Sequence, residues 1–160
     1  MATDENKMLV RRSIEEVQNQ GNLDVIDELY APDVVGYALW SHPLNPRTME
    51  EEPQSGLAEL KRLTAGWRTA FPDSHTTIEQ LMAEGDRVMC WTTTRGTHTG
   101  EHFGIAPTGR QVTYTSFSVF RVADGKIAEE WYMWDRLGFF QQLGVASDTR
   151  TLVARAKRAA

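Results

Sequence analysis

The sequence contains one cysteine, no long apolar run and no surplus of basic residues. Cys90 alone cannot form an internal disulfide, so the chain suits a reducing compartment. No stretch approaches the ~20 apolar residues of a membrane-spanning helix, and the first residues lack the apolar core of a secretion signal. We therefore predict a cytoplasmic protein without a membrane partner.

The charge balance argues against a nucleic-acid partner. Lys and Arg together number 17 against 22 Asp and Glu, which gives a formal net charge of -5. An acidic chain without a basic run binds nucleic acids poorly, so we expect no nucleic-acid partner. A length of 160 residues is enough for one domain with a sizeable core.

The first half of the chain shows mainly helical patterns. Apolar residues at helical spacing predict helices over 4–20, 23–30 and 56–71. Between the second and the third helix, "DVVGYALW" is a short strand candidate, and the proline-rich stretch 41–54 is a predicted loop.

From residue 76 the apolar residues recur with a period of two instead of the helical period. This change predicts four strands, over 76–84, 86–98, 110–124 and 126–135, followed by a short helix over 136–144. Helices followed by a run of antiparallel strands indicate an α+β fold, with the helices packed on one face of a curved, mainly antiparallel sheet. Such a cone-shaped barrel holds its pocket inside.

Three segments, in this order, carry a resemblance to a known family. They are "FPD" at 71–73, "GTHTGEHFGIAPTGR" at 96–110 and "DGKIAEEWYMWDRLGFFQQLG" at 124–144. The chain resembles the SnoaL-like polyketide cyclases and the related ester cyclases, which have the nuclear-transport-factor-2-like (cystatin-like) fold. We therefore expect a single domain over residues 1–145 and a C-terminal tail over 146–160.

The resemblance also implies an activity. The family's cyclases close a ring by intramolecular aldol condensation, without a metal or a cofactor, on a hydrophobic small molecule. The position of Asp135 matches the acid/base carboxylate of these cyclases. The resemblance further implies a homodimer formed through the sheet.

The surroundings of Asp135 agree with a base. It follows the strand face that carries Ile127, Trp131 and Met133, and Phe139 lies just beyond it. Apolar surroundings raise the pKa of a carboxyl group above its usual ~3.9, which makes the carboxylate a stronger base. Asp135 also directly precedes the predicted helix 136–144, so a role as helix N-cap stays open.

The strand 110–124 supplies further candidates. Tyr114, Ser116 and Ser118 share one strand face with Val112 and Phe120. By the resemblance, the two serines stand where the best-known cyclase has a glutamine and a histidine, and this departure weakens the case for the aldol reaction itself. Simple polar lining of the face is the alternative.

Other candidates are single residues with a structural alternative. Tyr37, followed by Ala38, stands where many relatives have His–Asn, and it either lines the pocket or belongs to the core. His98 either contributes to the pocket or braces its hairpin. It is four residues from His102, but no third metal ligand is evident, so we expect no metal site.

Two adjacent glutamates are ambiguous. By strand parity Glu129 shares the face of Asp135, so one of Glu129 and Glu130 is a candidate second carboxylate of the pocket, with a surface salt bridge as the alternative.

The predicted site has Asp135 and His98 as catalytic residues, and its substrate contacts are Tyr37, Trp67, Phe71, Tyr114, Ser116, Ser118, Trp131, Met133 and Phe139. The leading function is cofactor-independent acid/base chemistry on a hydrophobic carbonyl compound, with a polyketide ester cyclase first. An isomerase, a hydrolase or a hydroxylase on the same scaffold, a binding protein without turnover, and an adaptor subunit stay open.

Overall fold

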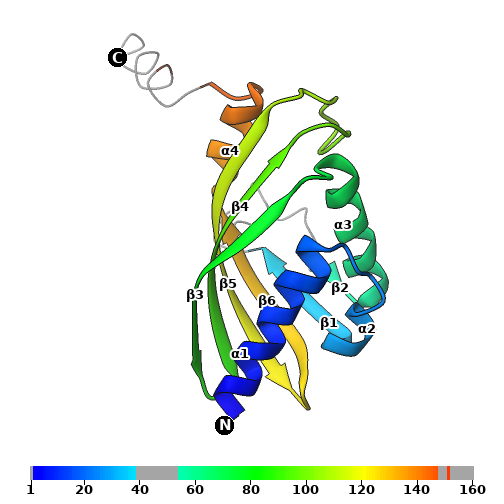
Figure 1. The fold of residues 1–160 in the computed structure, drawn as a ribbon, viewed down its shortest axis with the longest axis vertical. Coiled ribbons are helices and arrows are strands. Elements are labelled where there is room, and N and C mark those ends of the chain that lie inside the picture. The colour runs from blue at the N-terminus through cyan, green and yellow to red at the C-terminus, as the bar shows by residue number, and fades with distance from the viewer. Residues whose placement is uncertain (1, 39–53, 148–150, 152–160) are drawn as a thin grey trace.

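The computed structural model describes residues 2–38, 54–147 and 151. Residues 41–53 of the predicted loop and most of the predicted tail at 146–160 fall outside the described residues, whereas the last loop residue, Gln54, begins a short strand. Within them, a curved sheet carries a layer of N-terminal helices, as Figure 1 shows. None of the helices in these ranges is long and apolar enough to cross a membrane.

The sheet has the strand order β2-β1-β6-β5-β4-β3. β1 runs parallel to β6, and every other neighbouring pair is antiparallel. The predicted mainly antiparallel sheet is therefore confirmed. The strands are β1 (Tyr30–Ala38), β2 (Gln54–Ser55), β3 (His75–Glu84), β4 (Arg87–Thr97), β5 (Gln111–Ala123) and β6 (Lys126–Trp134).

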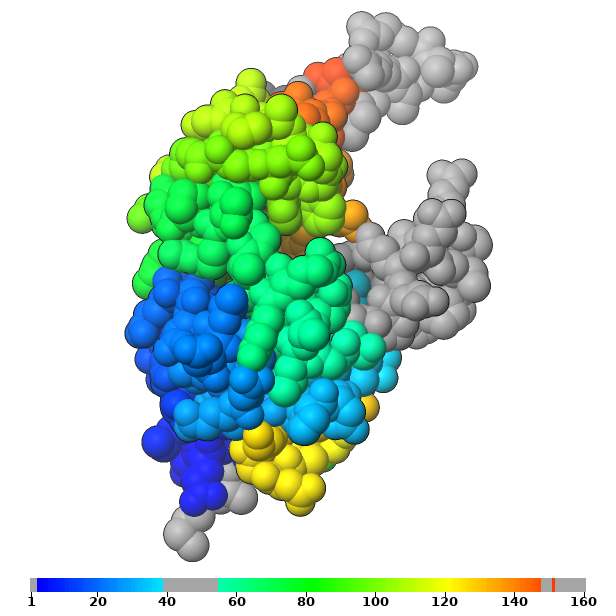
Figure 2. Space-filling view, turned by 90° about the vertical axis from the view of Figure 1, so that its right-hand side faces the viewer, coloured from blue at the N-terminus to red at the C-terminus, as the bar shows by residue number. Residues whose placement is uncertain are grey.

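The predicted helices are present with two changes. The helix expected over 4–20 changes from α-helix to π-helix at Ser13, and the helix expected over 23–30 is one turn because Tyr30 already begins β1. The helices are α1 (Ala2–Arg12), η1 (Ser13–Asn19), α2 (Ile26–Leu29), α3 (Leu57–Ala70) and α4 (Arg136–Leu143). In Figure 2 the blue N-terminal helices and the blue-green α3 lie side by side on one face of the molecule.

Two apolar clusters hold the layers together. One joins α1, η1 and α2 to the sheet and includes Val10, Leu29 and Phe120. The other joins the end of α3 to β5 and α4 and includes Phe71 and Phe139. Helices that bury an apolar stripe on one sheet face give the layered α+β arrangement predicted from the order of the elements.

A one-residue bulge at Ala128 decides which side chains of β6 point inward. Before the bulge Ile127 pairs with Val122, whereas beyond it Glu130 pairs with Phe120. Because side chains alternate along a strand, one extra residue exchanges the two faces of everything that follows. The even-numbered residues from Glu130 onward therefore face the helices, and the odd-numbered ones face away.

Candidate active site

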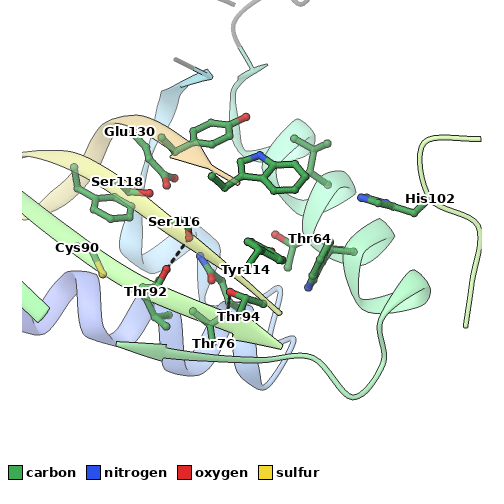
Figure 3. Close-up of a pocket in the computed structure, with 17 residues that line it drawn as sticks. Thr64, Thr76, Cys90, Thr92, Thr94, His102, Tyr114, Ser116, Ser118 and Glu130 are labelled. Carbon is green, nitrogen blue, oxygen red and sulfur yellow. Dashed lines mark hydrogen bonds between the residues drawn. The ribbon is translucent and has the colours of Figure 1, made fainter. Parts of the chain in front are cut away.

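A pocket of about 290 Å³ lies between the helix layer and the sheet. Its lining includes Ile14 and Phe120 from the first apolar cluster, and Trp67, which packs against the second, so it lies between the two. Strands β3 to β6 form the floor, η1 and α3 form the roof, and His102 lines the pocket from the loop between β4 and β5 (Figure 3).

Hydroxyl groups form two rows across the pocket floor. In one row the side-chain oxygens of Thr92 and Ser116 are 2.7 Å apart, and in the other those of Thr76 and Thr94 are 2.9 Å apart. Tyr114 extends the second row by a hydrogen bond to Thr94. The residues in each row are cross-strand partners, so their side chains meet on one face. These rows offer donors and acceptors to uncharged oxygen atoms of a ligand.

Glu130 is the carboxylate of the pocket. Its burial raises the pKa of the carboxyl group to about 7, and a hydrogen bond with Ser118 offsets part of this effect. Figure 3 shows both side chains at one end of the pocket together with Cys90, with His102 at the other end. Among the described residues of the lining there is no lysine and no arginine. The carboxylate is thus available for proton transfer near neutral pH.

His102 reaches the pocket from a tight turn. Phe103 and Gly104, which form the tip, both have positive φ, and the backbones of His102 and Ile105 bond to each other on either side of it. The imidazole lies edge-on to Trp67, with 5.4 Å between the ring centroids. Burial lowers the pKa of His102 to about 4, so the ring is neutral at pH 7.

Gly100 fixes the position of this segment against α3. Its N–H group and that of Thr99 both donate to the Ala70 carbonyl oxygen. A Cβ atom at Gly100 would lie 2.6 Å from the Thr69 carbonyl oxygen, closer than real side chains approach. No group of three or more potential metal-binding side chains occurs within the described ranges.

The structure places four of the predicted substrate contacts in the pocket lining. These are Trp67 on α3 and Tyr114, Ser116 and Ser118 on β5. The strand face predicted from parity on 110–124 therefore has the expected orientation, because β5 runs without a bulge along this stretch of its pairing with β4.

Asp135 lies outside the pocket lining that the described residues form. It is exposed, and its Oδ1 accepts the N–H of Gly138 at 2.8 Å as the N-cap of α4. Two apolar side chains near it in sequence, those of Met133 and Leu137, are each 51% exposed and so do not enclose this carboxylate. The structure thus provides the capping role that the sequence left open.

Three predicted contacts lie on the opposite face of the sheet. The bulge at Ala128 turns Trp131 and Met133 outward, and Tyr37 stacks on Trp131 at 5.5 Å between ring centroids. The sequence prediction placed Trp131 and Met133 on the same face as Ile127, because residues alternate between faces in a regular strand. The bulge lies between Ile127 and these residues, so that prediction was wrong.

Three further candidates are buried behind the pocket wall. Phe71, Phe139 and His98 are each 0% exposed and are absent from the described lining. His98 stacks on Phe71, and its Nδ1 accepts the N–H of Thr108 across the base of the long loop. His98 thus has the bracing position that the sequence left open as the alternative.

Of the two glutamates that the sequence left ambiguous, parity pointed to Glu129, whereas the structure turns Glu130 inward, and one sequence signal indicates this register. Arg121 and Glu129 are opposite charges that form an ion pair on the outer face. Placing them opposite each other requires one extra residue in β6, and the same register turns Glu130 inward.

A curved sheet, a layer of N-terminal helices and an interior pocket define the nuclear-transport-factor-2-like class of α+β folds. The predicted fold class is confirmed. The family model of the SnoaL-like polyketide cyclases matches residues 8–143, and the chain belongs to this family.

Individual relatives agree with this assignment. The aklanonic acid methyl ester cyclase DauD of Streptomyces sp. (strain C5) is 29% identical over 138 residues, which cover 85% of this chain and 80% of DauD. The crystal structure of AclR from Streptomyces galilaeus has a TM-score of 0.77 and 30% identity, with 96% of this chain and 94% of AclR covered. That of IdmH from Streptomyces antibioticus has a TM-score of 0.71 and 29% identity, with 88% of this chain and 99% of IdmH covered.

Proposed function

We propose that this protein is a cofactor-independent acid/base enzyme of the polyketide cyclase type, acting on a neutral, oxygen-rich aromatic ester. The pocket is the observation that carries the proposal. Its two hydroxyl rows suit carbonyl and hydroxyl oxygens, and the rings of Trp67, Tyr132 and Trp134 suit a flat aromatic skeleton.

The charges in the pocket favour an ester over a free acid. The described lining contains the Glu130 carboxylate and no lysine or arginine, so a carboxylate on the substrate would meet a like charge without a cation to balance it. An ester removes that charge. The relatives named aklanonic acid methyl ester cyclases support the same substrate class.

A second candidate is a binding protein without turnover. The exposed, helix-capping position of Asp135 favours it, because the carboxylate expected to act as the base is outside the described lining. The enzyme proposal stands instead on the presence of a different carboxylate, Glu130, inside the pocket.

Filling the pocket should abolish binding. In Ser116→Phe the new ring would occupy a large part of the cavity, and we expect affinity for aklanonic acid methyl ester to fall at least ~100-fold. Binding would be measured by quenching of tryptophan fluorescence, and turnover by mass spectrometry. Thr115→Phe adds the same ring to the outer face and is the matched control.

The outcomes of this experiment separate the candidates. Equal binding by Ser116→Phe and wild type would place the ligand elsewhere and contradict the pocket. Binding that Ser116→Phe loses, with no turnover in wild type, would support the binding protein.

We also propose that two copies pair through the outer sheet face, as the family resemblance implies. Trp91 and Phe117 stack there at 5.8 Å between ring centroids while 38% and 43% exposed, beside the exposed Met133. Exposed apolar patches of this kind mark interaction surfaces.

A charge at the centre of this face should separate the two copies. We expect Phe117→Glu to sediment as a monomer at micromolar concentration while wild type sediments as a dimer. Phe103→Glu alters a ring that is also exposed, at 52%, but lies on a different segment outside the sheet strands, and it should leave the dimer intact. A monomeric wild type would contradict the pairing.

A cytoplasmic location completes the proposal. Cys90 is a free, buried thiol, and a reducing compartment keeps such thiols unpaired. The partner is then a small hydrophobic molecule, without nucleic acid or membrane, in line with the acidic balance of the chain.

A further inference from the structure

We propose that Glu130 is the base that removes the α-proton of the substrate, the role that the family resemblance gives to Asp135. The inference rests on the proposed acid/base function and names the group that performs it. Glu130 and Asp135 are both on or next to β6, but only Glu130 is in the pocket lining that the described residues form.

The backbone places this carboxylate inside. The bulge at Ala128 gives Glu129 and Glu130 opposite faces of the sheet, so Glu129 pairs with Arg121 outside while Glu130 pairs across the strands with Phe120 inside. Two adjacent residues with the same side chain therefore meet entirely different surroundings. Only one of them can reach a molecule held in the pocket.

The Glu130 carboxylate is also free to accept a proton. Its hydrogen-bond partner, Ser118, is uncharged, and no described lysine or arginine lines the pocket beside it. Asp135, by contrast, already accepts the N–H of Gly138 and is exposed to water. A carboxylate held away from water without a counter-ion is a stronger base than a solvated one.

Two titratable groups that face Glu130, Tyr30 on β1 and Cys90 on β4, stay neutral near pH 7. A third, Tyr132, lies on β6 itself. Burial, and to a smaller extent the Glu130 charge, raises the pKa of Tyr30 well above its usual range and that of Cys90 to about 12. The pH dependence of proton removal in this part of the pocket should therefore be that of Glu130.

The proposed ring closure balances in atoms and electrons without an added reactant. Glu130 takes the proton from the carbon beside a carbonyl group, and the electrons of that C–H bond form an enolate. The enolate carbon attacks a second carbonyl carbon of the same molecule, so a C–C bond forms and the π electrons of that carbonyl move to its oxygen. Glu130, now neutral, returns the proton to this oxygen, and a hydroxyl group results.

Three single substitutions test the assignment. With aklanonic acid methyl ester as substrate, we expect Glu130→Gln to lower kcat by ~10²–10⁴ and to change KM less than ~3-fold, because the amide keeps the shape but cannot take the proton. Glu129→Gln and Asp135→Asn should each stay within ~3-fold of wild type. Exchange of the α-proton in D2O, followed by NMR, would report the first step separately from ring closure.

The pH profile gives a readout that a structural role would not move. For wild type and for Asp135→Asn, kcat/KM should rise as the pH rises through about 7, where Glu130 loses its proton. The residual activity of Glu130→Gln should lack this rise. Binding by tryptophan quenching would show that each variant keeps its pocket.

These experiments distinguish failure of the Glu130 assignment from failure of the proposed function. Turnover in wild type that Asp135→Asn loses and Glu130→Gln keeps would overturn this assignment and leave the proposed function standing. Binding of the ester by wild type, without exchange or ring closure, would overturn both the function and the assignment.

Discussion

Replacing Glu130 with glutamine should raise the free energy of unfolding by about 3 kcal/mol at pH 8 and leave it almost unchanged below pH 4. The carboxyl pKa is about 7 in the folded protein and near 4.5 when the chain is unfolded, which corresponds to about 3 kcal/mol. Between these two values the folded state keeps a proton that the unfolded state loses. Wild type therefore loses stability as the pH rises through this window, and glutamine, which cannot ionise, does not.

Denaturant unfolding of wild type and Glu130→Gln from pH 4 to pH 8 would measure this gain. Glu129→Gln is the matched control, because it removes an ion pair with Arg121 and should cost about 0–1 kcal/mol. A difference between wild type and Glu130→Gln that stays constant over this range would contradict the raised pKa. A gain at pH 8 together with lost turnover is the pattern expected when an active site keeps an unfavourable buried charge for its chemistry.

Replacing Phe139 with alanine should destabilise the protein by about 3–5 kcal/mol, the usual cost of removing a fully buried phenylalanine ring. The side chain is 0% exposed. Its ring centroid lies 5.1 Å from that of Trp134 and 5.7 Å from that of Tyr114. Both of these neighbours line the pocket, so the cavity left by Phe139 should also weaken ligand binding. Thermal and denaturant unfolding would give the loss of stability.

Phe140→Ala is the matched control for this prediction. Phe140 is the next residue of α4 but is only half-buried, so the same truncation removes less buried surface and should cost about half as much. Equal losses for the two variants would show that α4 packs differently from the arrangement described above. An unchanged affinity in Phe139→Ala would show that the pocket wall does not depend on this ring.

The parts of the fold that sequence could predict are those with local causes. The helix at 56–71 and the hairpin turn at Asp124 and Gly125 follow from spacing and turn chemistry within a few residues, and both are present. The capping by Asp135 is equally local, since it joins residues three apart. The short β2 was not predicted, because two residues carry no period and its pairing partner is Val35 and Gly36 of β1.

The candidate site depended on a less local feature. Parity gave the right face for Ser116 and Ser118, because β5 is regular there. It gave the wrong face for Trp131 because of the bulge at Ala128. The bulge arises from the pairing of β6 with β5, so it cannot be predicted from the alternation of residues along β6 alone. Parity likewise pointed to Glu129 as the inward glutamate instead of Glu130, an error of register and not of chemistry.

The same bulge affects the carboxylate of the pocket and the walls of the pocket differently. If Ala128 paired with Arg121 as in a regular strand, Glu129 would lie opposite Phe120 and turn inward in place of Glu130, and the pocket would keep a carboxylate. The walls would change, because Trp131 and Met133 would replace Tyr132 and Trp134. Two adjacent glutamates after a bulge thus let a one-residue shift of register alter which molecules fit while a carboxylate stays in the pocket.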